Sequence, residues 1–141
     1  VSWVVGDGHN MPKTMKNLAD MRINPKVVND QFGRLTFASD IARATKFFLD
    51  NKVAYGLYNV TNEGPVKSWY EIAADVFEYA GYDRSRVQPI STEEYAASKP
   101  GFAPRPLNSD MDLSKLRQTG FVPSDYTEML KEYVNQLSTN K

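Results

Sequence analysis

Short apolar runs alternate along this sequence with longer segments of helical periodicity, and this alternation limits the folds that the chain can adopt. Runs of strand type occupy residues 2–5, 26–29, 57–60 and 87–90. The last run suits a sheet edge, because Pro89 has no amide hydrogen to donate. Strands that alternate with helices are typical of an α/β fold. We therefore expect one α/β unit with few short strands and about five helices.

Two helix starts are marked by capping boxes, in which a serine and a glutamate three residues later satisfy free backbone amides. Ser68 and Glu71 form one such pair, and Ser91 and Glu94 form the other. Gly81 suits the end of the helix that follows Ser68, because glycine adopts a positive φ without strain. We expect Pro12 in the first turn of another helix, Ser39 as the cap of the next, a short helix over residues 113–119, and a last helix that Ser124 opens.

Composition excludes several classes of partner and site. The 17 basic residues balance the 17 acidic residues, so we expect no nucleic-acid partner. No apolar run has the length of a membrane span, and the apolar start at residues 1–5 lacks a basic leader, so we expect neither a membrane partner nor a signal peptide. The absence of cysteine excludes disulfides and thiolate metal sites and fits a reducing compartment, which predicts a cytoplasmic protein. His9 is the only histidine, so we expect no metal site.

Two motifs look catalytic but stand in the wrong context. Gly6-Asp7-Gly8 starts like a dinucleotide fingerprint, but it lacks the third glycine and the later acidic residue. Tyr95 and Lys99 have the Tyr-x-x-x-Lys spacing of short-chain dehydrogenases, but they stand on a short helix that runs into Pro100. We interpret the first motif as a tight turn and the second as the end of a surface helix.

Two arginines stand in loops rich in turn residues. Arg34 follows residues 30–33, and Arg105 lies between two prolines. A guanidinium on a rigid loop suits bidentate phosphate recognition. A surface salt bridge explains the same arginines equally well, so the residues alone leave both interpretations open.

Several segments resemble, in order along the chain, those of the dTDP-4-dehydrorhamnose reductase family. They are SWVVG (2–6), NMPKTM (10–15), VVNDQFGRLT (27–36), DIA (40–42), GLYN (56–59), SWYE (68–71), PISTEEY (89–95) and RPLNS (105–109). The resemblance covers nearly the whole chain. Departures from the family pattern are Val5, Met11 and Leu35, where the family has a tyrosine, an aromatic residue and a proline.

This resemblance implies that the chain is the C-terminal part of an extended short-chain dehydrogenase, whose fold is NAD(P)-binding and Rossmann-like. Residues 1–141 would form the substrate-binding domain, and the N-terminal dinucleotide-binding half, with the catalytic tyrosine, would be absent. The family carries a hydride from NADPH or NADH to the C4 ketone of dTDP-6-deoxy-L-lyxo-4-hexulose, the last step of dTDP-L-rhamnose biosynthesis for cell-surface polysaccharide. We expect no catalytic residue in this chain, no bound coenzyme and no activity of the chain alone.

The resemblance also implies a set of substrate-binding residues. Trp3 would approach the sugar, and the others would lie near the nucleotide, its base or its diphosphate: Asn10, Lys13, Gln31, Arg34 and Arg105. The partners would be a dTDP-sugar and the missing coenzyme-binding half. Without that half, the apolar faces at 4–5 and 27–28 would be exposed, which predicts self-association as a homodimer.

Two other functions remain open. The regulatory subunit of methionine adenosyltransferase is a similar protein that acts as a binding partner instead of an enzyme. Other extended short-chain enzymes act on different nucleotide sugars as epimerases or dehydratases. The Ser-Trp-Val segment at 2–4 and the Asp30-Gln31 pair favour the reductase over these enzymes.

Overall fold

The computed structural model describes residues 1–139 and has the expected α/β architecture. Within these residues it has six α-helices, one for each helix expected from the sequence: α1 (Met11–Asp20), α2 (Ala38–Asp50), α3 (Trp69–Tyr79), α4 (Thr92–Ser98), α5 (Ser114–Gln118) and α6 (Tyr126–Thr139). The strands are β1 (Val4–Val5), β2 (Lys26–Val28), β3 (Phe32–Gly33), β4 (Thr36–Phe37), β5 (Lys67–Ser68) and β6 (Gln88–Ile90), and a 3₁₀ turn covers Arg84–Arg86.

The strands pair two by two. β1 is parallel to β4, β2 is parallel to β6, and β3 is antiparallel to β5. In the second pair Val28 is in register with Ile90, so the chain segments that leave β2 and β6 continue side by side. This register brings the segments after β2 and β6 next to each other.

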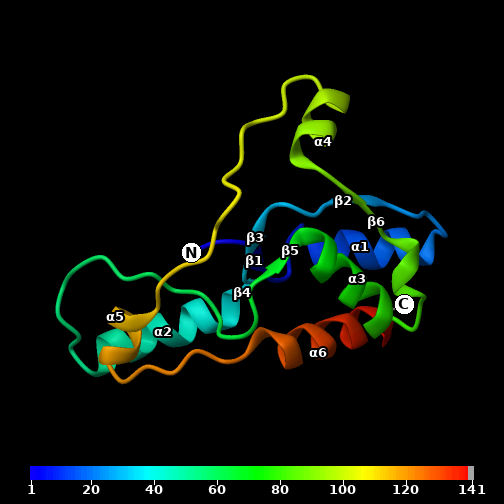
Figure 1. Cartoon of the computed structure of the whole chain (residues 1–141). Helices are drawn as coiled ribbons and strands as arrows, with labels where there is room; N and C mark the ends of the chain where they lie inside the picture. The colour runs from blue at the N-terminus through cyan, green and yellow to red at the C-terminus, as the bar shows by residue number, and fades with distance from the viewer. Residues whose placement is uncertain (140–141) are drawn as a thin grey trace.

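The hydrophobic core is built around α3, which packs against α1, α6 and β2. Ile72, Val76 and Phe77 of α3 are fully enclosed. Figure 1 shows the three helices close together, while α4 and the loop that leads from it to α5 stand away from this group. A smaller apolar cluster joins α2 to α5 through Ala44 and Leu116.

Both predicted capping boxes are confirmed. The Glu71 amide donates to the Ser68 hydroxyl at 3.2 Å, and the Ser68 amide donates to the Glu71 carboxylate at 2.7 Å. Ser91 and Glu94 repeat the arrangement at the start of α4, at 3.1 and 3.2 Å. Gly81 follows α3 with a φ of 85°, as a C-terminal glycine should.

Two predicted helix starts are wrong by one or two residues. α2 begins at Ala38 with Phe37 at the cap position, so Ser39 lies inside the helix. α6 begins at Tyr126, because the backbone and hydroxyl of Ser124 instead form hydrogen bonds with Asp40 and Asn62. At Ser124 these tertiary contacts outweigh the local capping preference of serine.

The predicted strand at 57–60 is not formed. The segment pairs with no strand in residues 1–139, and Leu57 is 90% exposed. A strand needs a neighbour for its backbone groups, and a run of suitable residues does not supply one.

The chain covers most of the apolar surface on which we based the homodimer. Val5, Val27 and Val28 are buried within the chain, and only Val4 is exposed, at 47%. The expectation that all four valines would lie open is therefore wrong, because the helices around α3 cover this surface. The homodimer itself stays a prediction.

None of the helices between residues 1 and 139 combines the length and the apolar content that a membrane crossing requires.

Asn62 joins three parts of the fold although it lies in a loop. Its side-chain oxygen accepts from the Phe37 amide at 2.7 Å, and its Nδ2 donates to the Asp40 carboxylate at 2.7 Å and to the Ser124 carbonyl at 2.9 Å. Asn62 is completely buried, so each partner depends on it instead of on water.

We expect Asn62→Ala to lower the free energy of unfolding by about 3 kcal/mol, because it leaves buried polar groups unpaired. Urea denaturation measures this change. Asn59→Ala is the matched control, since Asn59 is exposed and makes one long hydrogen bond to the Asp112 carbonyl, and it should change stability by less than about 0.5 kcal/mol. Equal losses in the two variants would contradict the structural role of Asn62.

Candidate functional site

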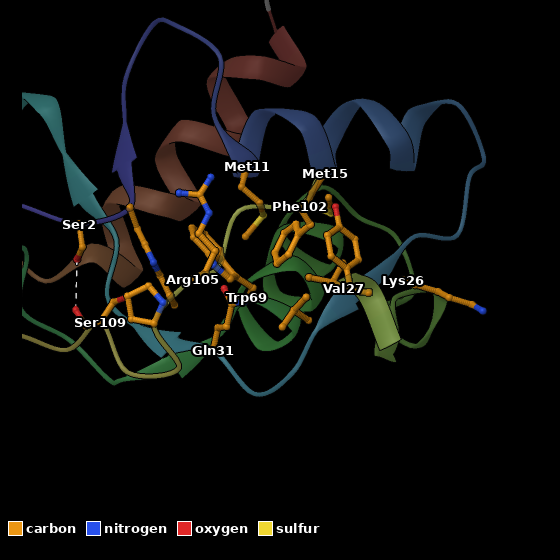
Figure 2. A pocket seen from close by; sticks show the side chains of 14 residues that line it. Ser2, Met11, Met15, Lys26, Val27, Gln31, Trp69, Phe102, Arg105 and Ser109 are labelled. Atoms are coloured by element: carbon orange, nitrogen blue, oxygen red, sulfur yellow. Dashed lines mark hydrogen bonds between the residues drawn. The ribbon is translucent and has the colours of Figure 1, made fainter. Parts of the chain in front are cut away.

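A cavity of about 490 Å³ lies where β2, the start of α3, α1 and the loop after α4 converge (Figure 2). This volume lies within the range of small-molecule sites. Its lining combines apolar and aromatic walls with a few polar groups: Ser2, Trp3, Met11, Met15, Lys26, Val27, Val28, Gln31, Trp69, Tyr95, Phe102, Arg105, Pro106 and Ser109. In Figure 2 the Lys26 side chain extends away from the other labelled groups.

The two tryptophans of the chain form one wall of the cavity. Trp3 stacks on Trp69 with ring centroids 3.7 Å apart and an interplanar angle of 24°. The capping box of Ser68 and Glu71 fixes the first turn of α3 and thereby the backbone of Trp69. Gly33 lies against the Trp3 ring, since a Cβ at this position would come within 3.1 Å of it. The absence of a side chain at position 33 therefore makes room for the stack.

Trp3 reaches the stack with an unusual backbone conformation. Its φ is 49°, in the left-handed region that a bulky residue rarely adopts. Strain of this kind persists only where the surroundings enforce it, and it is common at ligand sites.

α4 and the loop after it supply another part of the lining. Tyr95 packs edge-on against Phe102 with centroids 5.3 Å apart, and the Lys99 ammonium donates to the Tyr95 hydroxyl at 2.7 Å. α4 ends at Ser98, so the interpretation of this pair as a helix end is confirmed. Sequence reasoning nevertheless missed that Tyr95 lines the cavity.

Three of the six predicted substrate-binding residues come together at this cavity, namely Trp3, Gln31 and Arg105. Gln31 is nearly buried, and its Nε2 donates to the Thr92 hydroxyl at 3.1 Å. Arg105 is exposed, and its guanidinium has no hydrogen bond or ion pair to any residue between 1 and 139. The cavity therefore has one oriented amide in its wall and one unengaged cation at its edge.

The other three predicted residues do not line the cavity. Asn10 is buried as the cap of α1: its oxygen accepts from the Lys13 amide, and its Nδ2 donates to Gly6, Gly8 and Tyr133. The Lys13 ammonium donates to the Asp7 carbonyl at 3.0 Å beside a separate surface hollow. The structure thus gives Asn10 a structural role, and binding by Asn10 and Lys13 stays a prediction.

Arg34 is largely enclosed and faces Asp110 at 3.4 Å, the ion pair that we left open as an alternative. Its Nε is the one buried side-chain polar atom without a hydrogen bond in the part of the chain that the structure describes. A buried donor without a partner is costly. Phosphate contact by Arg34 stays a prediction.

A larger hollow, of about 860 Å³, lies between the end of α2 and residues 52–60. Its lining is mainly aliphatic and aromatic, with Lys52 as its one charged residue. It contains none of the six predicted substrate-binding residues and no converging polar groups, which a selective site needs. The smaller cavity is therefore the better candidate.

The cavity residues that sequence reasoning missed are mostly apolar, such as Met15, Trp69 and Phe102. Met15 and Trp69 stood in the family-like segments NMPKTM and SWYE without a role of their own, and Phe102 stood in a loop without a motif. One signal in the sequence could have pointed to an apolar cavity wall. Met11, which lines the cavity, stands where the related family has an aromatic residue.

Comparisons with known proteins agree with one another. The family model described as RmlD substrate binding domain matches residues 1–139. A dTDP-4-dehydrorhamnose reductase of Aggregatibacter actinomycetemcomitans is 39% identical over 142 residues, which is 92% of this chain and 47% of that protein. The chain spans about half the length of the curated relatives it matches.

Solved structures show the same similarity. A dTDP-4-dehydrorhamnose reductase from Clostridium acetobutylicum superposes with a TM-score of 0.85 at 37% identity, over 97% of this chain and 47% of the other. The Bacillus anthracis reductase, solved in complex with NADP, gives a TM-score of 0.76 at 32% identity, over 99% of this chain and 46% of the other. The predicted likeness to extended short-chain dehydrogenases is thereby confirmed.

We expect Gly33→Ala to disturb the stack of Trp3 and Trp69, because the added Cβ forces the Trp3 ring to move. Exciton-coupled circular dichroism of the two tryptophans should decrease, and stability should fall by about 1 kcal/mol, the size of an aromatic pair contribution. Gly8→Ala is the matched control, since a Cβ there meets nothing within 4 Å. An unchanged exciton signal in Gly33→Ala would rule out the close contact.

The capping hydrogen bonds at the start of α4 should depend on pH, because Glu94 accepts them as a carboxylate. The hydrogen bond from the Ser91 amide, and then that from the Ser91 hydroxyl, lower the pKa of Glu94 below its ordinary 4.5. A carboxyl whose pKa is lowered in the folded state stabilises that state above the unfolded pKa and loses the effect as pH falls through the lowered value. The amide NMR shift of Ser91 should therefore titrate with a midpoint below 4.5.

Glu94→Gln provides the control for this titration, because glutamine keeps the acceptor but does not ionise. Its Ser91 amide shift should stay constant across the same pH range. A midpoint at or above 4.5 in the unaltered chain would contradict the capping contact.

Proposed function

The chain belongs to the RmlD substrate binding domain family, and on that basis we propose that it is the sugar-nucleotide-binding part of a dTDP-4-dehydrorhamnose reductase. Residues 1–141 would form the substrate domain of this oxidoreductase. Its ligand would be a dTDP-sugar, and the product of the whole enzyme would be dTDP-L-rhamnose. The proposal places the protein in the cytoplasm. There the whole enzyme would provide the activated sugar that is used to build surface polysaccharide.

The observation that carries this proposal is the composition of the cavity. Its aromatic and thioether walls suit a flat base and a deoxysugar, since such groups bind by apolar contact and stacking. Arg105 brings an unengaged guanidinium to the same cavity, and a guanidinium pairs with phosphate oxygens in a bidentate manner. A nucleoside diphosphate linked to a sugar combines both chemistries in one molecule.

NADPH or NADH would bind mainly outside this chain. The turn at Gly6–Gly8 is the only segment with a fingerprint-like start, and its residues do not fit a coenzyme pyrophosphate. Asn10 already accepts from the Lys13 amide at the start of α1, and Pro12 in the same turn has no amide hydrogen, so neither residue offers a free amide to an anion. The NADP of the Bacillus anthracis relative supports an NADP-dependent whole enzyme, with a coenzyme-binding half as the partner of this domain.

Binding of dTDP to the chain tests the proposal. Isothermal titration calorimetry should show binding to the unaltered chain and about tenfold to a hundredfold weaker binding to Arg105→Ala, because a charge-assisted contact is lost. Arg117→Ala removes the same charge from an arginine that pairs with Glu63 outside the cavity, so it should bind dTDP like the unaltered chain.

Two results would contradict the proposal. If the unaltered chain, Arg105→Ala and Arg34→Ala all bind dTDP with equal affinity, the cavity is not the dTDP site. Tight binding of NADPH to this chain in a fluorescence titration would contradict the placement of the coenzyme outside it.

A further inference from the structure

We infer that Asp30 and Thr92 hold the side-chain amide of Gln31 in one orientation, so that the cavity presents a fixed acceptor that selects a pyrimidine base with an imide N–H. The inference rests on the proposed function and names the part of the ligand that Gln31 contacts. Thymine and uracil carry such a donor at N3, whereas cytosine carries an acceptor there.

The strand register brings the three residues together. β2 and β6 are parallel with Val28 opposite Ile90, so Asp30 and Thr92 follow their strands at equal distance. The Thr92 amide donates to the two Asp30 oxygens at 3.0 and 3.2 Å, and the Thr92 hydroxyl lies 2.6 Å from Oδ1. Gln31 is the next residue after Asp30 and lies within reach of the same hydroxyl.

The hydrogen-bond inventory then fixes the amide. A carboxylate at neutral pH only accepts, so the single hydrogen of the Thr92 hydroxyl goes to Asp30. The hydroxyl oxygen can therefore only accept from Gln31, and the group 3.1 Å away must be Nε2. The opposite orientation would place Oε1 against the lone pairs of Thr92. Thr92 is thus a positioning residue for Gln31.

The carbonyl end of the amide is left without a protein partner beside the cavity. Gln31 lines the cavity, and Figure 2 shows it beside Trp69, whose backbone amide donates to the Gln31 carbonyl at 3.3 Å. Oε1 has no hydrogen bond with any residue between 1 and 139, and it is not among the atoms sealed from solvent without a partner. An accessible acceptor with a fixed direction is therefore available to a ligand.

The chemistry of that acceptor identifies its partner. Phosphate oxygens also only accept, so Oε1 repels a diphosphate and attracts a donor. The hydroxyls of the ribose and the sugar are donors too, but the N3–H of thymine lies on a flat ring, and the stacked tryptophans beside Gln31 suit a flat ring. Gln31 therefore contacts the base, and Arg105 is left to contact the diphosphate.

The experiment compares two ligands that share the 5-methyl group, dTDP and 5-methyl-dCDP, by calorimetry on the full chain. The unaltered chain should bind dTDP at least about tenfold more tightly, because a site that presents an oriented polar group rejects a ligand with the wrong partner. Thr92→Val removes the hydroxyl at nearly constant shape, and the freed amide can turn, so the affinity ratio should fall towards one. Thr92→Ser keeps the hydroxyl and should keep the ratio.

The ratio of affinities separates positioning from a structural effect, since a general loosening of α4 weakens both ligands together. Gln31→Met is a second variant, which removes the acceptor directly and should also abolish the preference. A preference that persists in Thr92→Val or Gln31→Met would overturn the inference. Equal binding of the two ligands by the unaltered chain would overturn it too, while dTDP binding that depends on Arg105 would still support the proposed function. No binding of dTDP at all would overturn both.

Discussion

The burial of α3 is the constraint on which the rest of the structure depends. Its residues from 72 to 77 are all buried, including Asp75, whose carboxylate meets the Lys67 ammonium at 2.6 Å and the Arg84 guanidinium at 3.4 Å. A helix enclosed on nearly every side needs neighbours all around it, and α1, α6 and β2 supply them. Because the first residue of α3 is Trp69, the packing that encloses the helix also fixes one wall of the cavity.

The sequence predicted the features that depend on neighbouring residues along the chain. Both capping boxes and the glycine after α3 follow from chemistry within a few residues, and the structure has all of them. The failures share one cause. The strand expected at 57–60 and the cap expected at Ser124 both depended on which distant groups would lie nearby, and a local pattern does not contain that information.

The site was predictable to a similar degree. Motif resemblance pointed to Trp3, Gln31 and Arg105, which line one cavity, but it could not tell that the Asn10 side chain would be used inside the fold. It also could not find Tyr95 as a cavity residue, because Tyr95 and Lys99 resembled a coenzyme motif that the short α4 does not support. Resemblance aligns residues, whereas the direction of each side chain depends on the packed structure.

Asn62 has a consequence for the path by which the chain folds. Its hydrogen bonds to Phe37 and Ser124 close loops of 25 and 62 residues. Closing a loop costs chain entropy that increases with its length, and contacts between distant residues slow folding. Until those loops close, the asparagine and its partners remain bonded to water, so this junction gives the chain little help at the start. The residue that locks the finished fold therefore belongs to the late steps of its assembly.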